Sequence, residues 1–185
     1  MKIALLGGAF NPPHLGHLMI AQQVLDFTET DEVWFLPNFG QEPPKPDVAQ
    51  VNDRLAMIRL LKMPKTKVST LEIDNRLDGN TINLLPFLPK ENEYKFILGS
   101  DWLQGFKLWG HWEELLQKLP FLIFPRHGFP NEPLYHGMTV IKHELLIVTD
   151  ISATKIRERI KRGLSVGQFV PKEIVYYIKE RGLYQ

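Results

Sequence analysis

Two histidines, His14 and His17, lie three residues apart, just after a stretch rich in glycine and proline. If a helix begins here, the two side chains share one face of its first turn. A helix start offers free N–H groups and a positive dipole end to a phosphate, and two imidazoles can donate further hydrogen bonds. The spacing predicts a phosphate site. The alternative is a stiff turn with two exposed histidines, and a zinc site would need further ligands.

The stretch before the histidines begins with Gly7 and Gly8. Neither residue has a side chain, so a ligand can approach the backbone closely. The spacing differs from the G-x-G-x-x-G fingerprint of dinucleotide-binding proteins. The stretch therefore favours backbone contact with a ligand without indicating a dinucleotide.

A second helix start with the same chemistry lies near the other end of the sequence. Ser152 is a good N-cap, Thr154 falls in the first turn, and Arg157 follows about one turn later. A guanidinium can bind a phosphate with two parallel donors. Residues 155–162 carry five basic residues and one acid. The alternative is therefore a capped helix with a solvated basic face, and a nucleic-acid contact is disfavoured by a net charge of only +1.

The elements that must position these residues alternate along the chain. Consecutive apolar residues predict strands that are buried on both faces, at 3–6, 33–36, 94–98, 121–124 and 145–148, with a possible edge strand at 68–73. Apolar stripes at helical spacing predict helices at 18–25, 51–61, 112–119 and 153–162, and a last helix from Pro171 to Gly182. The alternation predicts an α/β fold: a doubly wound, mainly parallel sheet with helices on both faces.

The residues with chemical potential follow predicted strand ends. The glycine and histidine stretch follows the first strand, Asp101 follows residues 94–98, Arg126 follows residues 121–124, and Ser152 follows residues 145–148. Ligands bind outside the carboxyl ends of strands in open α/β sheets. We expect these segments to meet at one edge, where two helix starts suited to phosphate would fit a triphosphate.

Composition sets the class of protein. The 185 residues suit a single domain, 1–185, and 44% hydrophobic residues suffice for a core. No cysteine is present, which excludes disulfides, thiolate metal sites and cysteine nucleophiles, and fits a reducing cytosol. The first apolar run is too short for a signal peptide, and no run could span a membrane. We expect a cytoplasmic protein, either a monomer or a homo-oligomer, without membrane or nucleic-acid partners.

Two motifs make a resemblance specific. Residues 7–17 resemble the G-G-x-F-x-P-x-H-x-G-H signature of the HxGH nucleotidylyltransferase superfamily, and residues 151–157 resemble its I-S-x-T-x-x-R signature. Shorter matches point to bacterial nicotinate-nucleotide adenylyltransferases: Arg54 and Met57 in an R-x-x-M helix, Gly99-Ser100-Asp101 followed by Trp109, and residues 170–184. The resemblance covers essentially the whole chain.

The resemblance implies a Rossmann-like domain whose C-terminal helical part, about 151–185, completes an ATP site. It also implies adenylyl transfer from ATP to nicotinate mononucleotide without a covalent intermediate, giving deamido-NAD and pyrophosphate, with Mg²⁺ bound alongside ATP. The roles carried over by motif position are catalysis for His14 and His17; ATP binding for Gly7, Gly8, Ala9, Phe10, Lys45, Ser152, Thr154 and Arg157; and mononucleotide binding for Thr81, Asp101 and Trp109. No protein residue is implied as a metal ligand.

Two segments depart from the family pattern. Residues 79–85 lack the serine and tyrosine of the family's S-Y-T-x-D-T-L stretch, and Pro86 is expected to shorten the helix that follows. The family's P-P-H-K loop reads Pro43-Pro44-Lys45, without the histidine. Three alternatives therefore stay open: an adenylyltransferase for nicotinamide mononucleotide, one for pantetheine phosphate, or a nucleotide-binding regulator without turnover.

Overall fold

The computed structural model describes residues 1–40 and 47–185. Its core is one sheet of six parallel strands in the order β3-β2-β1-β4-β5-β6. The strands are β1 (Lys2–Gly8), β2 (Glu32–Pro37), β3 (Thr66–Val68), β4 (Glu93–Gly99), β5 (Phe121–Phe124) and β6 (Met138–Val140). The predicted α/β fold with a parallel sheet is confirmed, and the sheet order is that of Rossmann-like proteins.

Alternate residues of the central strand feed two cores. Ala4 and Leu6 belong to one buried cluster, and Ile3 and Leu5 belong to the other, because successive side chains of a strand point to opposite faces. The first core is covered by α1 (Leu15–Phe27), α2 (Val51–Ile58), α6 (Ala153–Lys161) and α7 (Lys172–Glu180). The second is covered by α3 (Leu71–Asp74), α4 (Thr81–Leu84) and α5 (Trp112–Lys118). Helices therefore lie on both faces, as predicted.

The strand predicted at 145–148 is wrong. These residues form a loop, with Leu145 and Ile147 exposed, and β6 occupies the sheet edge beside β5 instead. The backbone of Ile147 forms hydrogen bonds in both directions with the Gln23 side chain of α1. A side chain thus satisfies the polar groups that a strand would pair in a ladder.

The edge strand predicted at 68–73 is only partly correct. An edge strand exists, but it covers Thr66–Val68, and residues from Leu71 onward turn into α3. Helix α4 ends at Leu84 and continues as a short 3₁₀ turn containing Pro86, as expected from a proline that cannot extend an α-helix.

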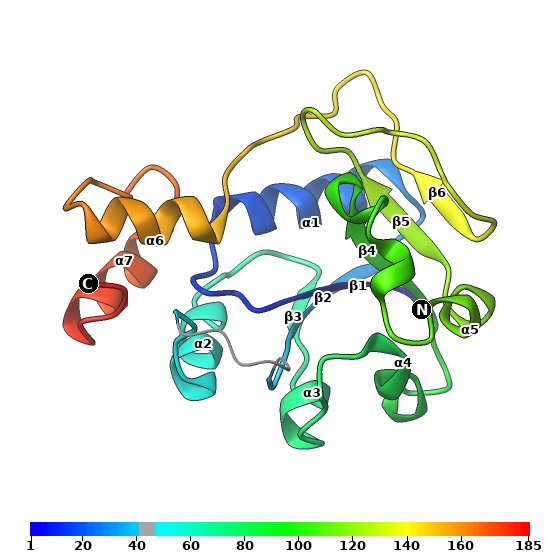
Figure 1. The fold of residues 1–185 in the computed structure, drawn as a ribbon, viewed down its shortest axis with the longest axis horizontal. Coiled ribbons are helices and arrows are strands. Elements are labelled where there is room, and N and C mark those ends of the chain that lie inside the picture. The colour runs from blue at the N-terminus through cyan, green and yellow to red at the C-terminus, as the bar shows by residue number, and fades with distance from the viewer. Residues whose placement is uncertain (41–46) are drawn as a thin grey trace.

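The carboxyl ends of the central strands point toward one end of the molecule. Figure 1 shows α6 and α7 at that end, beside the start of α1. The strand order reverses between β1 and β4, and such a reversal opens a crevice at the carboxyl edge of a sheet. Among residues 1–40 and 47–185, no helix has the length and apolarity needed to cross a membrane.

Candidate active site at the carboxyl edge of the sheet

The two histidines form a compact pair at the start of α1. His14 is the N-cap, and its backbone N–H donates a hydrogen bond to His17 Nδ1 over 3.1 Å. The two rings are in contact, with their centroids 3.8 Å apart and their planes tilted by 32°. His14 is only 6% exposed, so the alternative of two exposed histidines on a turn is wrong.

Both imidazoles are neutral at pH 7. Burial, assisted by the positive charge of Arg126, lowers the pKa of His14 to about 2 and that of His17 to about 4. Because His17 Nδ1 accepts a hydrogen bond, the proton of the neutral ring lies on Nε2, which can donate to a ligand. His14 Nδ1 is buried and has no hydrogen-bond partner among the described residues.

Two glycines of the first motif make room for protein atoms. A Cβ at Gly16 would lie only 2.9 Å from His14 Nδ1, so glycine makes room for the His14 ring, while Ile151 of the late motif would be at ordinary contact distance, 3.5 Å away. A Cβ at Gly7 would lie 2.6 Å from the ring of Phe96. The close approach expected at Gly7 is therefore made by a neighbouring strand; at Gly8 an added Cβ would make only ordinary contacts.

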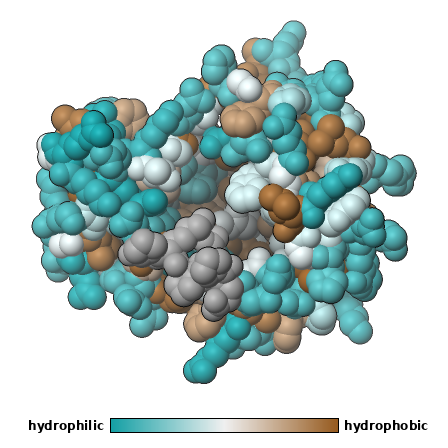
Figure 2. Space-filling view, viewed as in Figure 1, coloured by the Kyte–Doolittle hydropathy of each residue, from teal (hydrophilic) through white to brown (hydrophobic). Residues whose placement is uncertain are grey.

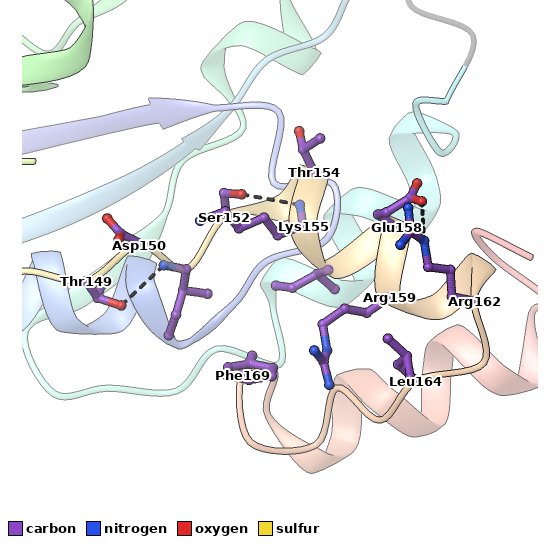
Figure 3. A pocket seen from close by; sticks show the side chains of 12 residues that line it. Thr149, Asp150, Ser152, Thr154, Lys155, Glu158, Arg159, Arg162, Leu164 and Phe169 are labelled. Carbon is purple, nitrogen blue, oxygen red and sulfur yellow. Dashed lines mark hydrogen bonds and ion pairs between the residues drawn. The ribbon is translucent and has the colours of Figure 1, made fainter. Parts of the chain in front are cut away.

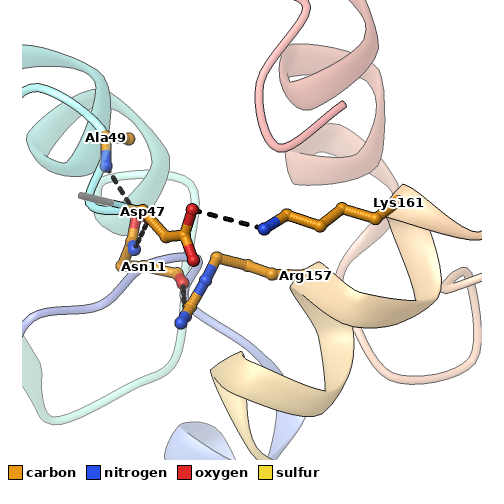
Figure 4. A network of polar contacts seen from close by, with 5 residues as sticks. All are labelled: Asn11, Asp47, Ala49, Arg157 and Lys161. Atoms are coloured by element: carbon orange, nitrogen blue, oxygen red, sulfur yellow. Dashed lines mark hydrogen bonds and ion pairs between the residues drawn. The ribbon is translucent and has the colours of Figure 1, made fainter. Parts of the chain in front are cut away.

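Asn11 forms hydrogen bonds with three distant segments, of which residues 47–49 and Arg157 are drawn in Figure 4 and Tyr184 is the third. Its side-chain oxygen accepts hydrogen bonds from the Tyr184 hydroxyl at 2.7 Å and the Ala49 N–H at 3.0 Å. Its side-chain nitrogen donates to the Asp47 carbonyl at 2.8 Å. Its own carbonyl accepts from Arg157 Nη1 at 2.8 Å, across 146 positions of sequence. The two motifs therefore touch, as predicted, although the strand predicted at 145–148, just before the late motif, is absent.

Helix α6 presents its motif residues in different directions. Ser152 is the N-cap, and its hydroxyl accepts from the Lys155 N–H at 3.3 Å, as expected for a capping serine. Thr154 is exposed in the first turn. Lys161 lies one turn beyond Arg157 and pairs with Asp47 at 3.2 Å. The motif thus supplies one hydroxyl already used by the helix, one exposed hydroxyl, and a guanidinium beside Asn11.

A cavity of about 720 Å³ lies along another side of α6 (Figure 3). Its lining includes Ser152 and Thr154, but not the two histidines or Arg157. Arg159 and Phe169 also line it, with the Arg159 guanidinium 5.2 Å from the centroid of the Phe169 ring. This cavity borders the late motif and is separate from the histidine pair.

Asp101 follows β4 and faces Arg126, which follows β5. Asp101 Oδ1 lies 3.6 Å from Arg126 Nε, and Arg126 Nη1 donates to the Thr149 carbonyl at 3.2 Å. A Cβ at Gly99 would collide with the Asp101 carboxylate, which explains the glycine of the G-x-D match. The strand ends of β4 and β5 thus meet at the edge, as predicted.

Trp109 is half-buried in an aromatic cluster. Its ring lies 5.7 Å from Phe96 and 5.5 Å from Phe106, and 6.3 Å from the exposed Trp102. One part of the tryptophan therefore packs in the second core and another remains accessible. Thr81, the remaining residue predicted for the mononucleotide, is buried at the start of α4.

Sequence reasoning assigned no role to three residues that the structure shows to hold the site together: Asn11, Arg126 and Arg54. Arg126 follows a strand end and Arg54 belongs to the R-x-x-M match, so both carried a usable signal, whereas the contacts of Asn11 depend on segments far apart in sequence. Lys45, predicted to bind ATP, lies outside the described residues.

The surface is hollowed between the side formed by α6 and α7 and the side formed by α4 and α5 (Figure 2). The N–H groups expected to be free at the start of α1 are partly used, because the Leu15 N–H donates to the Phe169 carbonyl at 2.9 Å. A Rossmann-like sheet with a histidine pair and a guanidinium at its carboxyl edge defines a nucleotide-binding α/β protein.

Comparison with known proteins gives the family. The cytidylyltransferase-like family model matches residues 5–159. A nicotinate-nucleotide adenylyltransferase of Bacillus subtilis is 31% identical, covering 100% of this chain and 98% of its own. A probable nicotinate-nucleotide adenylyltransferase of Caldicellulosiruptor saccharolyticus is 38% identical, with 100% of both chains covered. The chain belongs to the cytidylyltransferase-like family and, within it, to the nicotinate-nucleotide adenylyltransferases, which confirms the resemblance.

Solved structures agree on the fold. The nicotinic acid mononucleotide adenylyltransferase of Plasmodium falciparum complexed with NaAD superposes with a TM-score of 0.85 at 20% identity, covering 99% of this chain and 97% of that one. The same protein complexed with APC gives a TM-score of 0.74 at 17% identity, covering 99% and 96%.

Proposed function

We propose that this protein transfers the adenylyl group of ATP to nicotinate mononucleotide, releasing pyrophosphate and forming deamido-NAD. The observation that carries the proposal is the 2.8 Å contact between Arg157 and the Asn11 carbonyl, which sets the late motif beside the histidine motif. The names of relatives aligned over the full chain supply the substrates. Residues 151–185 then supply part of the ATP site, as the resemblance implies.

The reaction needs positioned donors more than a base. The 5′-phosphate of the mononucleotide is already an anion and attacks the α-phosphorus of ATP in line with the leaving pyrophosphate. Negative charge accumulates on phosphate oxygens, and donors aimed there lower the barrier. His17 Nε2–H and Arg157 supply such donors, and His14 packs against His17 and holds its ring.

The remaining assignments follow the two halves of the substrate pair. Gly8, Ala9 and Phe10, with Gly7 supporting them from β1, form the backbone beside the nucleotide, and Ser152 and Thr154 place the start of α6 near its phosphates. Asp101 is assigned to a ribose, Trp109 to stacking on the pyridine, and Thr81 to the pyridine carboxylate region. These three lie on the side of β4, α4 and α5.

We also propose that Mg²⁺ arrives with ATP. Among the described residues, no three histidine or acidic side chains cluster as ligands for a metal. Mg²⁺ commonly retains waters and binds substrate phosphates. When bound, it would neutralise charge on the triphosphate, while His17 and Arg157 orient the phosphate oxygens.

The direct test measures pyrophosphate release from ATP with three acceptors side by side: nicotinate mononucleotide, nicotinamide mononucleotide and pantetheine phosphate. We expect turnover to be fastest with nicotinate mononucleotide. A faster reaction with another acceptor would reassign the substrate and point to the altered residues 79–85. ATP binding without pyrophosphate release from any acceptor would favour a regulator.

A further inference from the structure

Arg54 of α2 is a buried cation whose hydrogen-bond partners in residues 1–40 and 47–185 are all neutral. The residue is 2% exposed. Its guanidinium donates to the carbonyls of Ala49, Ala9 and Phe39 and to the side-chain oxygen of Asn38, over 2.8 to 3.1 Å. Carbonyl and amide oxygens disperse the charge without cancelling it. Burial of a charge that has only neutral partners among the described residues is costly, which calls for a reason to keep one here.

The adjacent carboxylate is engaged elsewhere. Asp53, the neighbour of Arg54 in α2, accepts from the Tyr177 hydroxyl at 2.9 Å and from Arg181 Nε at 3.2 Å. The two side chains therefore serve different parts of the molecule: Asp53 ties α2 to α7, and Arg54 reaches under the loop that follows β1.

The bond to Ala9 fixes the orientation of one peptide group. The peptide between Ala9 and Phe10 is trans, so its C=O and N–H point in opposite directions. Because Arg54 Nη1 holds the Ala9 carbonyl at 2.8 Å, the Phe10 N–H is directed away from Arg54. Among the described residues, that N–H has no hydrogen-bond partner.

Phe10 itself has an unusual backbone conformation. Its φ is +49°, a region that costs a non-glycine residue free energy and persists only where surrounding contacts impose it. Its ring is buried, 4.7 Å from His17. Arg54 on one side and the His17 contact on the other therefore hold a strained residue at the edge where the two motifs meet.

We propose that Arg54 is a positioning residue for ATP: it anchors the Ala9 carbonyl so that the Phe10 N–H is presented to a phosphate oxygen, and its charge lies behind that donor. The proposal rests on the proposed function for the identity of the ligand. It assigns Arg54 no contact with ATP. The bonds to Asn38 and Phe39 extend the same support to the segment after β2.

The test compares Arg54→Lys with Arg54→Met. Arg59→Met is the matched control, because Arg59 is an exposed arginine at the C-cap of the same helix, α2. Affinity for Mg·ATP is measured calorimetrically without a mononucleotide. Arg54→Lys keeps the charge but not the fork of donors. We expect both variants at Arg54 to bind ATP about tenfold to a hundredfold more weakly, the effect of losing a hydrogen bond to a charged group, and Arg59→Met to bind normally.

A second readout separates positioning from general destabilisation. The amide signal of Phe10, in protein labelled with ¹⁵N-phenylalanine and assigned with Phe10→Leu, should shift on ATP addition in wild type and much less in folded Arg54→Lys. The KM for the mononucleotide should stay within about twofold. An unmoved Phe10 signal in wild type would overturn the proposal even if neither Arg54 variant folds. Equal losses for both substrates in a folded Arg54 variant would also overturn it.

The test of Arg54 does not depend on which molecule accepts the adenylyl group. If wild type binds ATP but fails to adenylylate nicotinate mononucleotide, the proposed function fails while the ATP and Phe10 measurements still decide the role of Arg54. If turnover is normal and Arg54→Lys binds ATP like wild type, the proposed function stands and the positioning role fails.

Discussion

The two halves of the candidate site are built in different ways. The half around Asn11 is tied together by hydrogen bonds between segments as far apart as Asn11 and Tyr184, separated by 173 positions. The half around α4 relies on local bonds, such as those from Asn80 and Asn83 to Asp78, and on aromatic packing. Polyphosphate binding needs many donors fixed at once, whereas an acceptor pocket can be shaped by packing.

The difference accounts for one of the two departures from the family pattern, the one at residues 79–85. The changed residues 79–85 lie in the locally bonded half, where a substitution disturbs few distant partners. In the half around Asn11, which the proposed function assigns to ATP and which is called the ATP half below, Gly16 cannot gain a Cβ without moving His14. Asn11 cannot change without releasing the two segments bonded to its side chain, residues 47–49 and Tyr184. A network of long-range contacts restricts substitution more than local packing does.

The largest expected effect tests the ATP half. His17→Ala removes a neutral donor assigned to phosphate and should lower kcat by about 10²–10³, the usual effect of losing one positioned donor. Steady-state pyrophosphate release gives kcat, and circular dichroism checks the fold. His136→Ala, at an exposed histidine, should leave turnover unchanged. Normal kcat in folded His17→Ala would show that His17 is not a phosphate donor and that the half around Asn11 does not depend on positioned donors as described.

The next prediction concerns protein stability and the buried carboxyl group of Glu72 in α3, on the side of the molecule away from Asn11. Glu72 is 4% exposed, and its Oε2 has no hydrogen-bond partner among the described residues. Burial, with a smaller contribution from Asp78, raises its pKa to about 7. A folded pKa above the unfolded value means that this contribution to stability is full below about pH 4.5 and is lost as pH rises through about 7.

Glu72→Gln should therefore stabilise the protein at pH 9 by about 3 kcal/mol and have little effect at pH 4.5. Urea unfolding at the two pH values measures the difference. Glu113→Gln, at an exposed carboxylate of α5, serves as the control and should change little. Equal effects of Glu72→Gln at both pH values would show that the buried carboxyl does not titrate as described.

A smaller effect is expected on the affinity for the mononucleotide alone. Trp109→Ala removes a ring assigned to the pyridine and should weaken mononucleotide binding by roughly 1–3 kcal/mol, with ATP affinity unchanged. Calorimetry with each substrate provides the comparison. Leu108→Ala, at a side chain 87% exposed, is the neighbouring control. Weaker ATP binding with normal mononucleotide binding would place Trp109 in the other half.

The smallest effect should come from an exposed ion pair in the ATP half. Lys161 and Asp47 are 3.2 Å apart with side chains 42% and 57% exposed, and such pairs contribute about 0–1 kcal/mol. Lys161→Met should change the free energy of unfolding by less than about 1 kcal/mol, whereas Asn11→Ala should cost roughly 1–3 kcal/mol by leaving buried partners unpaired. Equal losses in denaturant melts would show that burial does not decide which contacts matter.

Much of the fold follows from local patterns. The apolar runs at 33–36 and 121–124 coincide with or lie within β2 and β5, and the caps at Ser152 and Pro171 open α6 and α7. These features depend on residues close in sequence, whose periodicity and capping chemistry can be read directly. The two motifs indicated phosphate chemistry for the same reason.

The sequence by itself determined the parallel α/β class, most helix and strand positions, and the residue types that suit a polyphosphate. Only the tertiary structure decided that residues 145–148 form a loop, that Gly7 accommodates Phe96, and that Arg54 holds the Ala9 carbonyl. Each of these depends on a partner distant in sequence. Local pattern limits which conformations a segment can adopt, but the satisfaction of its buried polar groups and the filling of its volume depend on what the folded chain brings beside it.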